Sequence, residues 1–144
     1  MISGTSAGFA RRLAALLYDS LLLAALLTIY TAAWVFARHG ALTEQSAGAW
    51  WYAYRAGELV LIGGYYVLNW MRSGQTLGMR AWRLRVVSDS GRALDLASAL
   101  LRFVCGLLAW APAALGVLWL YVDSEHLALH DRLSKTRMLR LTGS

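Results

Sequence analysis

A single aspartate interrupts an otherwise apolar run near the start of the chain. The run extends over residues 13–36, and Asp19 lies seven positions after Arg12. Seven residues make almost two helical turns, so both side chains share one helix face, about 10 Å apart along the axis. A carboxylate at the centre of a lipid-facing helix costs about 2.5–3.5 kcal/mol, so we expect Asp19 to face protein, water or a partner charge. Such an acid can exchange a proton or a cation, with Arg12 tuning its charge state.

The composition indicates an integral membrane protein. Hydrophobic residues make up 58% of the 144 residues and charged residues only 15%, whereas soluble domains carry about 25% charged residues. A soluble domain of this size could not bury so much apolar side chain. We therefore predict one membrane domain over residues 1–144.

Three apolar segments, each long enough to cross a bilayer as a helix, are joined by polar stretches. The apolar segments cover residues 13–36, 49–71 and 99–122. The polar loop covers residues 72–98, and the basic tail covers residues 123–144. We predict an all-α polytopic bundle of the three segments, with the third broken or kinked at Pro112.

The polar loop at 72–98 supports two local predictions. Alternating residues on both sides of a Ser-Asp-Ser-Gly turn favour a short hairpin that pairs Arg83–Val87 with Arg92–Leu96. Residues 76–82 fit an interfacial helix instead. We expect the loop to lie on the cytoplasmic side of the membrane.

The charge distribution suggests how the chain sits in the bilayer. The net charge is +6, and the basic residues flank the apolar segments, so we expect contact with anionic lipid headgroups and none with nucleic acid. If the first two segments each cross once, the positive-inside rule places the N-terminus and the polar loop in the cytoplasm. A single third crossing then puts the basic tail outside, whereas a re-entrant segment broken at Pro112 returns it to the cytoplasm. Both topologies stay open on charge alone.

Other ionisable residues give weaker signals. Glu58 is a second acid within an apolar segment, deeper than Arg55, which can snorkel to the interface. Asp131 has basic neighbours that are able to neutralise it at the surface. His126 and His130 are four positions apart but lack a third ligand, so we predict no metal site. No nucleophile stands beside a base, so we predict neither an enzyme nor a cofactor.

Four stretches together resemble the RDD family, bacterial membrane proteins named for one arginine and two aspartates. They are, in order, GFARRLAALLYD, GQTLGMRAWRLRVVSDSGRALDL, the Leu-Leu-Arg step ending at Arg102, and VLWLYVDSEHLALHDRLSKTRML. The name-giving residues then correspond to Arg12, Asp19 and Asp131. Ser134-Lys135 departs from the family's usual Ala-Gly, and Tyr18 from its usual aliphatic residue, but neither changes these charges.

The resemblance implies a multi-pass protein of the bacterial inner membrane that is suspected of transport, with cation–proton antiport proposed for some members. The candidate site for a small ligand, monovalent cation or proton then comprises Arg12, Asp19, Glu58, Arg102 and Asp131. Because two or three helices enclose no pathway, transport needs a homo-oligomer or a membrane partner. The alternative is a scaffold or accessory protein in which Arg12, Asp19 and Asp131 form a structural polar clasp. A network joining Arg12 to Asp131 favours the re-entrant topology.

Overall fold

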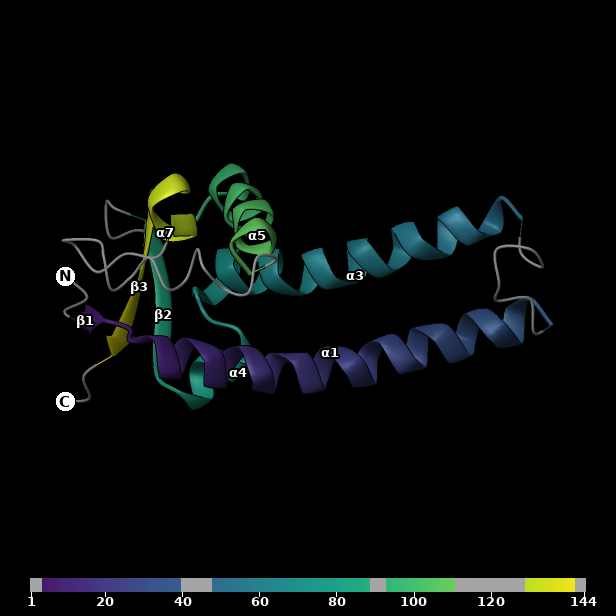
Figure 1. The fold of residues 1–144 in the computed structure, drawn as a ribbon, viewed down its shortest axis with the longest axis horizontal. Coiled ribbons are helices and arrows are strands. Elements are labelled where there is room, and N and C mark those ends of the chain that lie inside the picture. The colour runs from purple at the N-terminus through teal and green to yellow at the C-terminus, as the bar shows by residue number, and fades with distance from the viewer. Residues whose placement is uncertain (1–3, 40–47, 89–92, 111–128, 142–144) are drawn as a thin grey trace.

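Two long helices form an elongated hairpin, with a small sheet and shorter helices gathered at one end (Figure 1). The structure, a computed structural model, describes residues 4–39, 48–88, 93–110 and 129–141. Helix α1 has 29 residues and spans Phe9–Ala37, which at 1.5 Å per residue gives about 43 Å. Helix α3 has 24 residues, spans Trp50–Ser73 and returns antiparallel to α1.

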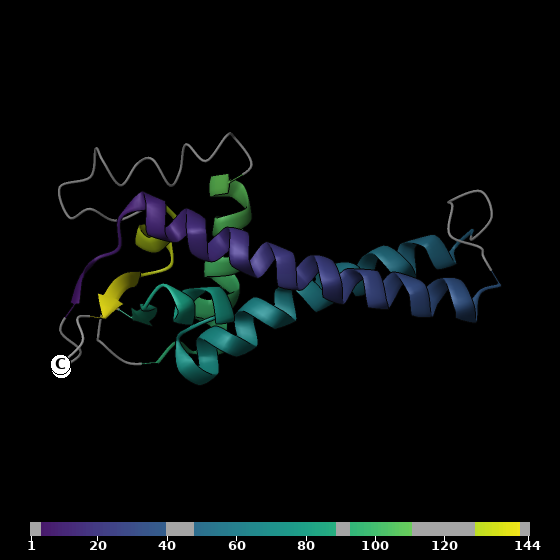
Figure 2. The ribbon, with the colours of Figure 1, turned by 90° about the horizontal axis from the view of Figure 1, so that it is seen from below.

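The far end of the hairpin is closed by aromatic packing. Tyr30 stacks on Tyr54 with ring centroids 5.5 Å apart, and Trp34 lies 5.6 Å from the same Tyr54 ring. Gly57 makes this approach possible, because a Cβ added there would lie 2.1 Å from the Tyr30 hydroxyl oxygen. Toward the other end the two helices separate, and α4 and α5 lie beside the space between them (Figure 2). The wide end of the hairpin therefore has room for the remaining elements.

A glycine ends α3 and starts the turn that follows. Gly74 has a φ of 69°, in the left-handed region that favours glycine, and its N–H donates to the Trp70 carbonyl at 3.0 Å. A Cβ at Gly74 would lie 2.6 Å from the carbonyl oxygen of Val86. The Val86 N–H in turn donates to the Gly74 carbonyl at 2.8 Å, so this turn joins α3 to the sheet.

The wide end carries a three-stranded antiparallel sheet in the order β1-β3-β2. β1 covers Gly4–Ser6, β2 Leu84–Ser88 and β3 Thr136–Leu141. The C-terminal strand lies in the middle, with Gly4 opposite Leu141 on one side and Leu84 opposite Arg140 on the other. The N-terminal strand, the loop strand and the tail therefore lie together, and the all-α fold class is wrong in this part of the chain.

The predicted loop hairpin is also wrong in its pairing. Its first arm does form a strand, β2, but the partner is β3 from the tail. In the second arm, Ala93–Asp95 has no regular structure, and α5 begins at Leu96 and runs to Trp110. Asp95 favours the helix, because its carboxylate accepts the Ser98 N–H at 3.2 Å and so caps the first turn.

The stretch at 76–82 contains the predicted short helix, α4, which spans Leu77–Ala81. Thr76 caps it by accepting the Met79 N–H at 3.2 Å. The buried residues of α4, Gly78 and Met79, pack toward α1 and the core. Whether this helix touches the membrane interface stays a prediction.

A small apolar core joins the sheet to the helices at the wide end. It includes Val67 and Trp70 from α3, Leu84 and Val86 from β2, and Ala99 from α5. The third apolar segment is described only as far as Trp110, and Pro112 lies outside the described residues. The chain is described again at α7, Leu129–Leu133, which packs against α5 and leads into β3.

Among the described residues, one helix is long and apolar enough to cross a membrane by length and composition. This is α1, which has a mean hydropathy of 2.0 over its most apolar window and exposes large side chains such as Leu21 and Ile29. The stretch Leu96–Leu108 is a shorter apolar helix. A crossing by α3, and hence the three-segment bundle, remains a prediction.

Candidate functional site

Asp131 lies between two arginines in the buried interior of the wide end. Its Oδ2 is 2.5 Å from Arg12 Nη1, and its Oδ1 is 2.5 Å from Arg102 Nη1. All three side chains are almost completely buried, at 3% exposure or less. Three elements far apart in the sequence, α1, α5 and α7, therefore meet at one carboxylate. We call Arg12, Arg102 and Asp131 the Arg–Asp–Arg cluster.

Neighbouring groups hold each arginine in position. Arg12 Nε donates to the Ala7 carbonyl at 2.8 Å, just before α1 begins. Arg102 Nη1 also donates to Thr136 Oγ1 at 2.5 Å, where β3 starts. The Arg102 guanidinium carbon lies 5.3 Å from the centre of the Trp70 ring, within the range of a cation–π contact. The cluster thereby connects the sheet to α1, α3 and α5.

The Arg–Asp–Arg cluster has more positive charge and more donors than its carboxylate can satisfy. Two guanidinium ions share one carboxylate, which leaves one positive charge uncompensated within the cluster. Arg12 Nη2 and Arg102 Nε are buried and have no hydrogen-bond partner among the described residues, and the same holds for Trp70 Nε1. An unsatisfied buried donor costs about 1–3 kcal/mol, so these groups call for a ligand or an ordered water.

Asp19 is held by a second and separate set of donors. Its Oδ1 accepts the Tyr65 hydroxyl at 2.7 Å and the Gly78 N–H at 2.8 Å, and its Oδ2 accepts the Thr76 hydroxyl at 2.5 Å. We call these four residues the Asp19 site. The acid in α1 is thus bound by neutral donors from α3, from Thr76 and from α4.

Gly78 is required by the geometry of the Asp19 site. A Cβ at this position would lie 2.2 Å from the Ala15 carbonyl oxygen and 2.9 Å from Asp19 Cγ. The first contact is with backbone, which cannot move aside as a flexible side chain can. The absence of a side chain lets the Gly78 N–H reach the carboxylate directly.

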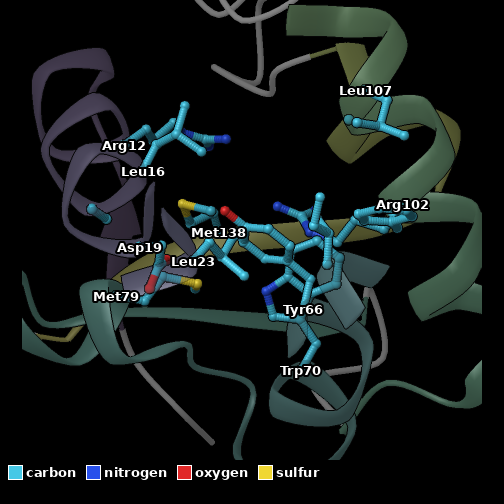
Figure 3. Close-up of a pocket in the computed structure, with 14 residues that line it drawn as sticks. Arg12, Leu16, Asp19, Leu23, Tyr66, Trp70, Met79, Arg102, Leu107 and Met138 are labelled. Carbon is cyan, nitrogen blue, oxygen red and sulfur yellow. The ribbon is translucent and has the colours of Figure 1, made fainter. Parts of the chain in front are cut away.

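Arg12 and Asp19 share a helix face, as their spacing predicts, but each binds a different partner. No ion pair joins them in the described structure, and Arg12 pairs with Asp131 instead. Both nevertheless line one cavity of about 310 Å³, together with Arg102. Figure 3 shows Arg12 and Asp19 on the α1 side of this cavity and Arg102 on the α5 side.

Glu58 does not belong to this site. It accepts the Tyr54 hydroxyl at 2.8 Å and pairs with Arg55 Nη1 at 2.7 Å, near the aromatic end of the hairpin. The Tyr54 hydroxyl also forms a hydrogen bond of 2.9 Å with the Thr31 hydroxyl in α1. Because Glu58 holds this tyrosine, it helps to join α3 to α1. Four of the five candidate residues therefore gather at the wide end, and Glu58 lies apart from them.

Several contributing residues were not singled out from the sequence. Tyr65, Thr76 and Gly78 bind Asp19, and Trp70 stacks on Arg102. Thr76 and Gly78 lie in the GQTLG stretch. The threonine just before a short helix and the glycine within it are the features of this stretch that could have pointed to a helix cap and a close contact. Among the described residues no three side chains are placed to share a metal ion. His126 lies outside them.

An exposed apolar helix long enough to cross a bilayer, with buried ion pairs and a small sheet at one end, is consistent with a membrane protein. The profile of the RDD family matches residues 6–135, so the chain belongs to the RDD family. It is a membrane protein of that family, and the match includes Arg12, Asp19, Arg102 and Asp131. No curated protein sequence and no solved structure matches the chain.

Proposed function

We propose that this protein binds a small ligand in the cavity at the wide end and moves it within or across the membrane. The observation that carries the proposal is the position of three charged side chains, Arg12, Asp19 and Arg102, on the wall of one cavity. The rest of the wall is mainly apolar. A cavity of about 310 Å³ with apolar walls and a few convergent polar groups is typical of small-molecule sites.

The proposed placement puts α1 and α3 across the bacterial inner membrane with the wide end toward the cytoplasm. The basic residues support this orientation, because the wide end carries Arg80, Arg83 and Arg85 from the loop region and Arg137 from the tail. Such residues stay on the cytoplasmic side and contact anionic headgroups. The pairing of β3 with both β1 and β2 supports a re-entrant third segment, because it keeps the tail at the N-terminal end.

The proposal includes a second copy of the chain or a membrane partner. The described helices form a hairpin with the shorter helices α4, α5 and α7 at its wide end, and this arrangement surrounds no continuous path. Exposed apolar residues on α5, including Leu100 and Val104, offer an apolar surface for either lipid or a neighbouring helix. No enzymatic step and no cofactor is part of this proposal.

Cation–proton exchange is the specific form of transport that the family resemblance suggests. In that mechanism Asp19 must exchange the donors from Tyr65, Thr76 and Gly78 for a proton or a cation. Purified protein in liposomes, loaded with a pH-sensitive dye and given Na⁺, Li⁺ or K⁺ gradients, tests it. We expect proton flux that Asp19→Asn abolishes without loss of the folded protein. Absence of flux from the wild type in all three gradients argues against this form.

The second candidate function is a non-transporting scaffold in which the same charges act as a polar clasp. It is favoured by the observation that Asp19 and Asp131 both have several protein partners. In this case Asp19→Asn lowers the melting temperature or the oligomer content, and the wild type gives no flux of any ligand. A wild type that transports while Asp19→Asn remains fully stable contradicts the clasp.

A further inference from the structure

The cavity wall is divided into a polar part and an apolar part. Arg12, Arg102 and Trp70 all line the cavity, and each has a buried nitrogen donor without a partner among the described residues. Leu16 and Leu23 from α1, with Leu107 from α5, are among the apolar lining residues. In Figure 3 the two arginines approach the cavity from opposite helices, with Trp70 below them.

The unpartnered donors identify the charge that the polar part accepts. All three are N–H groups, and an N–H group donates to an oxygen and cannot ligate a cation. The Arg–Asp–Arg cluster also carries one positive charge more than Asp131 compensates. A bound carboxylate or phosphate would supply the missing acceptors and the missing negative charge together.

Asp19 does not reverse this preference, although it lines the same cavity. Two of its hydrogen bonds come from hydroxyl groups and one from a backbone N–H, so donors already surround the carboxylate. A cation at Asp19 would have to displace these donors. An anion beside the arginines would lie about two helical turns from Asp19, because the two α1 residues are seven positions apart.

The apolar part of the wall indicates the rest of the ligand. Leu107 lines the cavity and is also 53% exposed on α5, so the cavity borders the outer apolar surface at this residue. The adjacent Leu108 is 67% exposed. An alkyl chain attached to an anion at the arginines therefore has an apolar route from the cavity to the surface of α5.

We propose that the cavity binds an anionic amphiphile: a carboxylate or phosphate head group at Arg12 and Arg102, with its alkyl chain leaving past Leu107. This inference rests on the proposed function and names the ligand class of the same site. The volume of about 310 Å³ accommodates the head group and the first carbons of the chain, and the remaining carbons extend along α5.

Two glycines offer a matched pair of variants that leave every charge in place. Gly106 lines the cavity, and a Cβ added there meets nothing within 4 Å, so Gly106→Leu starts its new side chain in open space at the cavity wall. Gly64 in α3 also has open space, and it is not among the lining residues. Gly64→Leu is therefore the control for the added side chain and for the change in helix propensity.

The experiment uses the full chain in nanodiscs of phosphatidylcholine. The probe is dodecyl phosphate brominated near its head group, and the readout is saturable quenching of Trp70 fluorescence, with Trp70→Phe and empty discs as background. Dodecyltrimethylammonium brominated at the same carbon is the cationic comparison. We expect saturable binding of the phosphate by the wild type and by Gly64→Leu, and its loss in Gly106→Leu. A charge-assisted hydrogen bond predicts at least tenfold weaker binding of the cationic probe.

The outcomes separate this inference from the proposed function. If both probes bind equally and Gly106→Leu blocks both, the cavity is a ligand site but the preference for anions is wrong. If neither probe binds saturably, the amphiphile proposal fails, whereas the proposed function fails only if the wild type also gives no flux in liposomes. If inorganic phosphate displaces the probe as well as dodecyl phosphate does, the ligand is a free anion and the amphiphile is excluded. Displacement by phosphatidylglycerol in the disc supports the proposal and names a membrane lipid as the source, whereas displacement by laurate supports it and names a free fatty acid.

Discussion

Arg12 Nη1 and Asp131 Oδ2 lie 2.5 Å apart although 119 positions separate the two residues in the chain. The contact joins the start of the long apolar helix to the segment just before the last strand. Arg102 binds the other oxygen of the same carboxylate, so one acid holds two helices.

Asp131→Asn should destabilise the protein strongly. The change leaves two buried guanidinium ions without a counter-charge, and breaking a buried ion pair in this way costs about 3–5 kcal/mol. Thermal unfolding in detergent, followed by circular dichroism, measures the effect. Arg55→Met is the comparison, because Arg55 is 60% exposed in its pair with Glu58, and exposed pairs contribute about 0–1 kcal/mol. Equal losses in the two variants contradict the role given to Asp131.

Thr76→Val should release α4 from α1 while the long hairpin persists. The hydroxyl of Thr76 donates to Asp19 and accepts the Met79 N–H, so both the anchor and the helix cap are lost. We expect faster hydrogen exchange at the amides of Gly78 and Met79, which measures local opening. Thr28→Val is a control, because its hydroxyl bonds only to the Ala24 carbonyl on the exposed side of α1. Unchanged exchange at Gly78 in Thr76→Val would show that the Asp19 site does not hold α4.

A series of glycine-to-alanine variants should rank by the contacts that the new methyl group meets. Gly78→Ala brings it 2.2 Å from a backbone oxygen, Gly57→Ala 2.1 Å from the end of the Tyr30 side chain, and Gly64→Ala within 4 Å of nothing. We expect the largest loss of stability, measured by thermal unfolding, at Gly78. Overpacking should cost about 1–3 kcal/mol at Gly57, and Gly64→Ala should cause no loss. A neutral Gly78→Ala would be incompatible with the close approach of α4 to α1.

The cap of α5 should contribute a pH-dependent part of the stability. Hydrogen bonds from the hydroxyl and the backbone N–H of Ser98 lower the pKa of Asp95 below its usual value. A carboxyl group whose pKa is lower in the folded state stabilises the fold above its unfolded pKa, about 3.9, and loses this contribution as the pH falls through the folded pKa. The melting-temperature difference between wild type and Asp95→Asn should therefore shrink as the pH falls from 7 to below 4. A difference that grows on acidification contradicts the assignment.

Single cysteines in a Cys105→Ala background should report the side of the membrane on which each end lies. Trp82 and Leu133 are exposed at the wide end, and Trp50 is exposed at the start of α3. We expect Trp82→Cys and Leu133→Cys to react with a membrane-impermeant maleimide only in inside-out vesicles, and Trp50→Cys only in right-side-out vesicles. Labelling of Leu133→Cys from the same side as Trp50→Cys would rule out the re-entrant topology.

The helical part of this fold is readable from the sequence because its signals are local. The length of the apolar run predicts α1, residues 76–82 contain the short helix α4, and the spacing of Arg12 and Asp19 places both on one wall. The sheet is harder to predict from the sequence, because the partner of β2 is β3, which lies far along the chain and is brought beside it only by tertiary contact. The Ser98 N–H donates to the Asp95 carboxylate and caps α5 at its start, so Ala93–Asp95 leads into a helix and forms no strand beside β2.

The spacing of residues in the sequence could not predict which groups bind the carboxylates of Asp19 and Asp131. Arg12 is the nearest cation to Asp19 along its helix, yet it binds Asp131, and Asp19 binds neutral donors from α3 and α4. Sequence distance therefore placed Arg12 and Asp19 on one wall but did not identify the partners of either. Thr136–Leu141 gave no clear strand signal, because its exposed Arg137 and Arg140 are three positions apart and do not follow the period of two of a strand.

The central place of β3 in the sheet sets the order in which the protein can be assembled. Synthesis runs from the N-terminus, so β1 and β2 both emerge before the strand that lies between them. Until the ribosome has passed Asp131 and β3, the nascent chain carries Arg12 and Arg102 without their counter-ion and two strands without a partner. A chain that is cut short before this point keeps its apolar helices but cannot close its polar end. The polar end of the native protein therefore forms only after the chain has been synthesised beyond β3.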